Sequence, residues 1–343
     1  MHWIGRRGSL LLGLVLLSGL ARGQEEPATD PPRLGRGESA HGSDVRLLAF
    51  SQDGRRLASA SVDGHIAVWD AGRGTLTTII SSSVTDLRFD VGNERLLVST
   101  NDNAYGSVAF VESGTIGAPF NVGWRSSGGC FSVAPVSTSL ALVGCADRQV
   151  FALDKATGAT WTALYPFSAE AFCANRILVD QDGHKAAFKT TEDSIGVFSV
   201  GQKGPFFEAS CRRGRLTAAF SPSGKEIACV SSDGFAIQVL DARTGLPQRT
   251  DLRVPGKRYI ESLRFMRRTV VALLGDGTLW SFDEETDAQE ERPLSLGRLN
   301  PWPRKPYVSA VASTPDGSVF AVALGGEIRI FETGTGRERV FPR

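Results

Sequence analysis

A nearly constant period runs along the chain and constrains its fold more than any other feature. Each period ends where a short apolar run is closed by an acidic residue, or in one case by a serine. Of the six steps between these closing residues, four are 42 residues long, and the last is longer by seven. A period of this length indicates an array of repeated structural units. The closing residues of the seven units are Asp70, Glu112, Asp154, Ser199, Asp241, Asp283 and Glu332.

Each unit has room for four short strands. In the first unit the apolar runs are Val45–Phe50, Leu57–Ser61, Ile66–Trp69 and Leu76–Ile80, with Asp63-Gly64 between the second and third. Asp-Gly steps suit tight hairpins because the turn needs a positive φ. Seven such units predict an all-β fold, a seven-bladed β-propeller of four-stranded antiparallel blades. Comparable turns recur at Asp182-Gly183, Ser223-Gly224, Asp233-Gly234, Asp276-Gly277 and Asp316-Gly317.

The first unit resembles the WD repeat. His41-Gly42 stands where that family has its Gly-His pair in reversed order, and Ser61, Asp63 and Trp69 fall on other recurring positions. The resemblance covers residues 41–343 and implies a Trp–Ser–His–Asp hydrogen-bonded network in the first blade, in an exported, bacterial member of the family. It also implies a scaffold that holds other proteins. The later units carry other residues in place of the tryptophan, namely Val111, Leu153, Phe198, Leu240, Phe282 and Phe331.

The first 23 residues have the pattern of a cleaved secretory signal. Arg6-Arg7 precedes the apolar stretch Leu10–Leu20, and Ala21-Arg22-Gly23 supplies small residues at the cleavage position. The stretch is shorter than the roughly 20 residues that a membrane span needs. We therefore expect export to a periplasm or to the medium, with no span after signal removal. An uncleaved anchor is the alternative.

The mature chain is expected to begin with a tether at residues 24–40 and to fold as one propeller domain over residues 41–343. The tether holds three prolines, mixed charges and one large aliphatic residue, and cannot bury enough surface to fold alone. The whole chain has a formal charge of +1. This balance argues against binding of nucleic acid through bulk charge. We expect a monomeric domain with no nucleic-acid partner.

Neither a metal site nor a catalytic motif is indicated. After signal removal the histidines are His41, His65 and His184, without the close spacing of metal ligands. No nucleophile elbow, phosphate-cradling loop or dinucleotide fingerprint is present in the sequence. The sequence therefore predicts no cofactor, no metal and no enzyme activity.

Five cysteines occur in a chain whose expected compartment permits disulfides. Aligning the third unit on the first places Cys130 and Cys145 nearly opposite each other on neighbouring strands. Two interpretations stay open, a disulfide between them or two buried thiols. Cys229 falls on a second strand and Cys211 just before an inner one, and Cys173 makes the count odd.

Basic and aromatic residues gather in the last three segments that join one blade to the next. Such joins emerge on one face of a propeller, so these residues would form a rim suited to an acidic peptide or anionic polymer. The alternative is that the arginines are merely solvated and that Trp302 caps the core. The predicted rim comprises Arg212, Arg213, Arg215, Lys257, Arg258, Tyr259, Trp302, Arg304 and Lys305.

The leading functional hypothesis is a non-catalytic interaction module outside the cytoplasm that binds an unidentified, acidic protein partner through a loop-covered face. One alternative is an exported propeller enzyme, similar to a lactonase or a quinone-dependent dehydrogenase. Another is a sensor for an anionic ligand or glycan. For ring closure, we expect Glu338–Phe341 to supply the outer strand of the seventh blade, without a strand shared with the N-terminal segment.

Overall fold

The computed structural model describes most of the chain beyond residue 39. The chain divides into two units, Met1–Gly35 and Arg36–Arg343, and every element named below belongs to the second. The described ranges are 40–81, 84–92, 95–102, 105–112, 115–121, 130–145, 150–164, 176–191, 193–200, 205–211, 217–266, 268–293, 308–333 and 337–341.

The described residues form seven antiparallel sheets, or blades, each built from consecutive strands in chain order. In blade 2 the outer strand is split into β8 and β9, because Pro119 between them has no N–H to donate.
Blades 1 to 3 contain β1 (Val45–Phe50), β2 (Arg56–Ser61), β3 (His65–Asp70), β4 (Thr75–Ser81); β5 (Val84–Phe89), β6 (Leu96–Asp102), β7 (Tyr105–Glu112), β8 (Thr115–Ile116), β9 (Phe120–Asn121); and β10 (Cys130–Pro135), β11 (Leu140–Cys145), β12 (Val150–Asp154), β13 (Thr160–Leu164).
Blades 4 and 5 contain β14 (Leu178–Val179), β15 (Lys185–Thr191), β16 (Ser194–Ser199), β17 (Pro205–Ser210); and β18 (Ala218–Phe220), β19 (Glu226–Val230), β20 (Ala236–Asp241), β21 (Pro247–Arg253).
Blades 6 and 7 contain β22 (Ile260–Met266), β23 (Thr269–Leu274), β24 (Thr278–Asp283), β25 (Gln289–Pro293); and β26 (Val308–Ser313), β27 (Val319–Leu324), β28 (Glu327–Glu332), β29 (Glu338–Val340).

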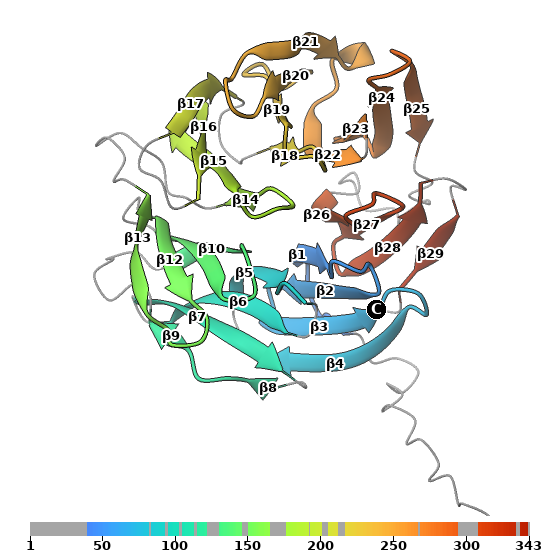
Figure 1. Cartoon of the computed structure of the whole chain (residues 1–343). Helices are drawn as coiled ribbons and strands as arrows, with labels where there is room; N and C mark the ends of the chain where they lie inside the picture. Colours follow the sequence, from blue (N-terminus) through green and yellow to red (C-terminus); the bar gives the residue numbers. More distant parts are fainter. Residues whose placement is uncertain are drawn as a thin grey trace, which may run out of the picture. The chain divides into compact units, whose positions relative to one another are not determined.

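The blades are arranged in a ring around their first strands. Each first strand contacts the first strand of the next blade, and β1 also contacts β26, which closes the circle. Figure 1 shows these inner strands gathered about the middle, with the later strands of each blade outside them. The predicted fold class is therefore confirmed as an all-β, seven-bladed propeller.

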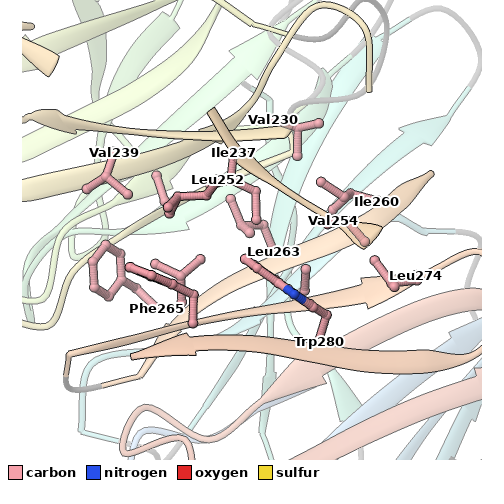
Figure 2. Packing of buried hydrophobic residues seen from close by; sticks show 14 residues of the cluster. Val230, Ile237, Val239, Leu252, Val254, Ile260, Leu263, Phe265, Leu274 and Trp280 are labelled. Atoms are coloured by element: carbon pink, nitrogen blue, oxygen red, sulfur yellow. The ribbon is translucent and has the colours of Figure 1, made fainter. Parts of the chain in front are cut away.

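Among the described residues the core forms seven apolar clusters, one between each pair of neighbouring blades. Successive side chains of a strand point to opposite faces of the sheet. In β3, Ile66 and Val68 accordingly pack toward blade 2, while Ala67 and Trp69 pack toward blade 7. Because both faces of β3 are covered, its four central residues are all buried and apolar. Figure 2 shows the cluster between blades 5 and 6, including Val230, Ile237, Val239, Leu252, Val254, Ile260, Leu263, Phe265, Leu274 and Trp280.

The recurring acids close the turns between the third and fourth strands. The Asp241 carboxylate accepts hydrogen bonds from the backbone N–H groups of Arg243, at 3.0 Å, and Thr244, at 2.7 Å. These bonds, that of Thr244 first, hold the pKa of Asp241 below its usual value. Asp154 and Asp283 cap their turns in the same way. The period in the sequence therefore reflects the recurrence of this turn from blade to blade.

The predicted glycine turns are confirmed by positive φ angles at the second residue of each pair. Gly183 shows why glycine is needed there. Its φ is 72°, and a Cβ at this position would lie 2.4 Å from the carbonyl oxygen of Val136 in blade 3. The turn between the first and second strands therefore also sets how closely two neighbouring blades approach.

The ring closes on a blade whose four described strands all come from the C-terminal part of the chain. β29 forms the outer strand of blade 7 and pairs with β28, as predicted from Glu338–Phe341. The backbone N–H of Val45 donates to the Gly325 carbonyl oxygen at 2.8 Å, which ties β1 to blade 7. Phe341 packs against Trp69 of blade 1, with 5.2 Å between ring centroids.

A buried ion pair links blades 2 and 3. Lys155 follows β12 and Asp90 follows β5, and their side chains are 1% and 3% exposed. The Lys155 ammonium also donates to the Ser137 carbonyl oxygen, and Arg95 approaches the other Asp90 oxygen at 3.3 Å. The charges are 65 residues apart in sequence, and nothing in the repeat pattern predicted their contact.

Candidate interaction face

The join between blades 5 and 6 carries the described part of the predicted basic and aromatic rim. The chain passes from β21 to β22 through a short 3-10 helix, η1 (Pro255–Lys257). Lys257 and Tyr259 are exposed, and Arg258 is partly buried. The other predicted rim residues lie outside the described residues, namely Arg212, Arg213, Arg215, Trp302, Arg304 and Lys305.

Two arginines of this join pair with acids of neighbouring turns, and Arg258 also pairs with an acid of β25. Arg258 pairs with Asp276, at 3.3 Å, and with Glu291. The hydrogen bond that Arg258 donates to Glu291 is the largest cause that raises the pKa of Arg258 above its usual value. Arg253 pairs with Asp233 at 3.4 Å. The charge of both arginines is therefore balanced locally. Lys257 forms no ion pair with the part of the chain that the structure describes.

These ion pairs show that the joins share one face with the turns between second and third strands. We call this surface the join face and define it by the segment 253–259 together with the turns at Asp63, Asp233 and Asp276. The turns between first and second strands, and those between third and fourth strands, lie on the opposite face, because the strands alternate in direction.

An aromatic pair stands on the join face beside Lys257. The ring of Tyr259 lies 4.5 Å from that of Phe235, centroid to centroid, at an interplanar angle of 36°. Phe235 follows the Asp233-Gly234 turn, so the two rings come from different blades. Tyr259 is 53% exposed. An exposed tyrosine supported by a second ring offers a rigid contact with little conformational freedom to lose.

The described residues contain no group of three or more His, Cys, Asp or Glu side chains that could hold a metal ion. Within the same residues, no helix is long and apolar enough to cross a membrane.

Blade 1 contains a buried polar network. The indole N–H of Trp69 donates to the Ser59 hydroxyl at 2.9 Å, and His41 Nε2 is hydrogen-bonded to the same oxygen at 2.7 Å. The Asp63 carboxylate accepts from the backbone N–H of Gly42 at 2.6 Å, which fixes the segment that carries His41. The network ties the join before β1 to the second and third strands.

The serine of this network is Ser59 and not the expected Ser61. The strand register places Trp69 opposite Leu57, so the indole reaches one position along the same face, to Ser59, and Ser61 lies beyond it. Ser61 instead donates to the Asp63 carboxylate within its own turn. His41, Asp63 and Trp69 occupy their expected places. The resemblance was thus read two residues too far along the second strand.

Burial of His41 makes blade 1 sensitive to acid. The side chain is 4% exposed, and desolvation lowers its pKa to about 4, against the opposing charge of Asp63. An unfolded histidine titrates near 6.5. As pH falls from 6.5 toward 4, the unfolded chain therefore binds the proton first, and the free energy of unfolding falls by about 3 kcal/mol.

Urea unfolding at a series of pH values checks this expectation. His41→Gln should lack this component of the pH dependence between pH 6.5 and 4, while retaining that of the carboxylates. Identical slopes in the wild type and the variant would show that His41 does not titrate with folding.

Comparison with known proteins relates the first blade to a protein family. The family model for the WD domain, G-beta repeat, matches residues 36–70, which hold the whole network of blade 1. The seven-bladed ring supplies the matching architecture.

The chain is a seven-bladed β-propeller that contains a WD repeat. It is similar to Protein tipD of Dictyostelium discoideum, with 21% identity over 211 residues, which are 60% of this chain and 33% of that protein. The match thus spans about a third of the relative's length.

Blade 5 of this propeller replaces the hydrogen bond with a disulfide. Cys211 and Cys229 are bridged. Cys229 occupies the same position in the second strand of blade 5 as Ser59 does in the second strand of blade 1. Cys211 precedes Cys229 by 18 residues, and His41 precedes Ser59 by the same number. One covalent bond therefore occupies the place of the histidine–serine contact.

Sequence reasoning concentrated on the other pair of cysteines. The register does place Cys130 opposite Cys145, as predicted, and their side chains lie outside the described residues. The bridge between Cys211 and Cys229 was missed. A signal for it was present, because their separation equals that between His41 and Ser59.

Proposed function

We propose that this propeller is a non-catalytic, monomeric interaction scaffold that acts outside the cytoplasm and holds a protein partner on its join face. WD-repeat propellers typically serve as scaffolds and usually bind protein partners. Analogy of fold alone does not fix a function, so the site must carry the proposal.

The observation that carries the proposal is the aromatic pair Phe235 and Tyr259 beside Lys257. Aromatic and basic side chains are enriched at the centres of protein interfaces. Lys257 is exposed, whereas Arg253 and Arg258 are already paired with acids of the propeller. The partner therefore places an acidic group opposite Lys257 and an apolar surface against Tyr259.

Two observations support a place outside the cytoplasm. The disulfide between Cys211 and Cys229 is of a kind that persists in oxidising compartments and is rare in the cytosol. The first 23 residues have the pattern of an export signal. Each is independent of the other.

A capture experiment with matched variants tests the proposal. The chain from residue 24 onward is immobilised and exposed separately to the exported and the cytoplasmic fractions of its source. The join-face variant carries Lys257→Glu and Tyr259→Ala. The control carries Lys225→Glu and Leu246→Ala, which are exposed positions on the opposite face of blade 5.

We expect a protein from the exported fraction to be retained by the wild type and by the control. The join-face variant should retain at least about tenfold less, since loss of a central interface residue costs more than about 1 kcal/mol. Equal retention by both variants would overturn the assignment of the join face. Retention from the cytoplasmic fraction alone would overturn the exported location.

A further inference from the structure

The ring encloses a central cavity of about 400 Å³. It is lined by the ends of the inner strands and the turns that follow them, with contributions from all seven blades, so it is the central channel of the propeller at the face opposite the join face. A volume of this size is in the range that holds small-molecule ligands.

Three arginines from alternate blades line this cavity. Arg88 comes from β5 in blade 2, Arg176 from the start of blade 4 and Arg264 from β22 in blade 6. Arg88 and Arg264 occupy the same register, because each lies next to the phenylalanine that ends its apolar run. At that register the other five blades carry four alanines and one leucine, namely Ala49, Ala134, Leu178, Ala219 and Ala312.

The acidic residues of the cavity wall are engaged elsewhere. Asp90 is bound by Lys155 and Arg95, and Asp180 by Lys185 at 3.3 Å. Near the arginines, Asp86 pairs with Arg88 at 2.9 Å. The carboxylate of Asp86 also accepts a hydrogen bond from Ser132.

Arg264 is held by carbonyl oxygens. Its guanidinium donates to Leu263, at 2.7 Å, and to Val311 of blade 7, at 3.1 Å, and within the described residues it forms no ion pair. Burial, followed by the positive charges of Arg176 and Arg88, lowers the pKa of Arg264 to about 9. Like charges thus converge in a confined space that excludes much of the solvent, where an anion would be favoured.

We propose that the channel binds a small oxyanion with at least two negative charges, of the phosphate or carboxylate kind, between Arg88, Arg176 and Arg264. The planar guanidinium group matches both kinds of oxyanion by paired hydrogen bonds. The small side chains of Ala49, Ala219 and Ala312, which also line the cavity, leave the room that the ligand occupies. This site is separate from the join face, and its binding does not depend on a protein partner.

Thermal unfolding of the full chain tests the site directly. Pyrophosphate and citrate serve as probes at about 5 mM, with sodium chloride at equal ionic strength as the reference. We expect at least one probe to raise the Tm of the wild type by about 3 °C or more through binding to the folded state. Which probe does so distinguishes a phosphate from a carboxylate ligand. No shift with either probe would overturn the proposal.

Variants separate binding from a structural role of the arginine. Arg264→Gln should reduce the affinity for the probe, measured by calorimetry, at least about tenfold, whereas the exposed control Arg243→Gln should leave it unchanged. If Arg264 merely joined blades 6 and 7, the variant would have a lower Tm and an unchanged response to the probe.

A second measurement needs no variant. Phenylglyoxal modifies accessible arginines, and peptide mass mapping reports each site. Pyrophosphate or citrate should protect Arg88 and Arg264 in the folded wild type and leave Arg243 unprotected. Equal modification with and without the probe would contradict binding in the channel, even if Arg264→Gln failed to fold.

Discussion

Replacing Trp69 with alanine is expected to lower the free energy of unfolding by about 3–5 kcal/mol. The indole is 1% exposed, contacts Phe341 and donates its N–H to Ser59. It belongs to the cluster between blades 7 and 1, so the cavity would form at the contact that closes the ring. Equilibrium unfolding in urea, followed by far-UV circular dichroism, measures the change.

Trp69→Phe is the matched control. It keeps an aromatic ring in the cluster and removes the hydrogen bond to Ser59, which should cost only about 1–2 kcal/mol beyond the change in volume. The difference between the two variants then measures the packing contribution. Equal losses in both would show that the hydrogen bond, and not the filled volume, holds the closure.

Replacing Lys155 with methionine should destabilise the propeller by about 3 kcal/mol. The change leaves the buried Asp90 carboxylate with Arg95 as its described counter-charge, at 3.3 Å, and removes the donor to the Ser137 carbonyl oxygen. A charge that loses its partner in a dry contact costs more than the pair contributed when intact. Urea unfolding of the variant beside the wild type gives the value.

Two further variants make this expectation specific. Lys225→Met, at an exposed position, should change stability by no more than about 0.5 kcal/mol. Asp90→Asn combined with Lys155→Met should recover part of the loss, because the uncompensated negative charge is gone. If Lys155→Met were as mild as Lys225→Met, the pair would not be buried in solution.

Short sequence signals predicted the architecture because the same kinds of turn recur from blade to blade. Asp241 and Asp283 recur since each caps a turn through its own neighbours, and glycines such as Gly183 recur since each turn needs a positive φ. Such signals lie within a few residues of one another. They fix the number of blades and the strand boundaries, and for that reason the propeller could be predicted.

Contacts between residues far apart in the sequence could not be predicted from these short signals. The pairing of Lys155 with Asp90 and the bridge from Cys211 to Cys229 depend on which side chains meet across sheets, and the repeat pattern does not encode this. Even the network of blade 1 was misread by two residues, because the choice of Ser59 follows from register. The channel arginines do have a signal in the sequence, because Arg88, Arg176 and Arg264 follow one another at intervals of 88 residues, about two repeats.

In blades 1 and 5 the segment before the first strand is joined to the second strand at equivalent positions, by a hydrogen bond in blade 1 and by a disulfide in blade 5. The two bonds respond to different solution conditions. The contact between His41 and Ser59 weakens in acid, whereas the bridge between Cys211 and Cys229 is indifferent to acid and yields to reductants. Because the network of His41 includes Trp69, which packs on Phe341, acid acts at the seam of the ring. In an acidified, oxidising compartment the propeller would loosen first at that seam, and in a reducing one it would loosen first at blade 5.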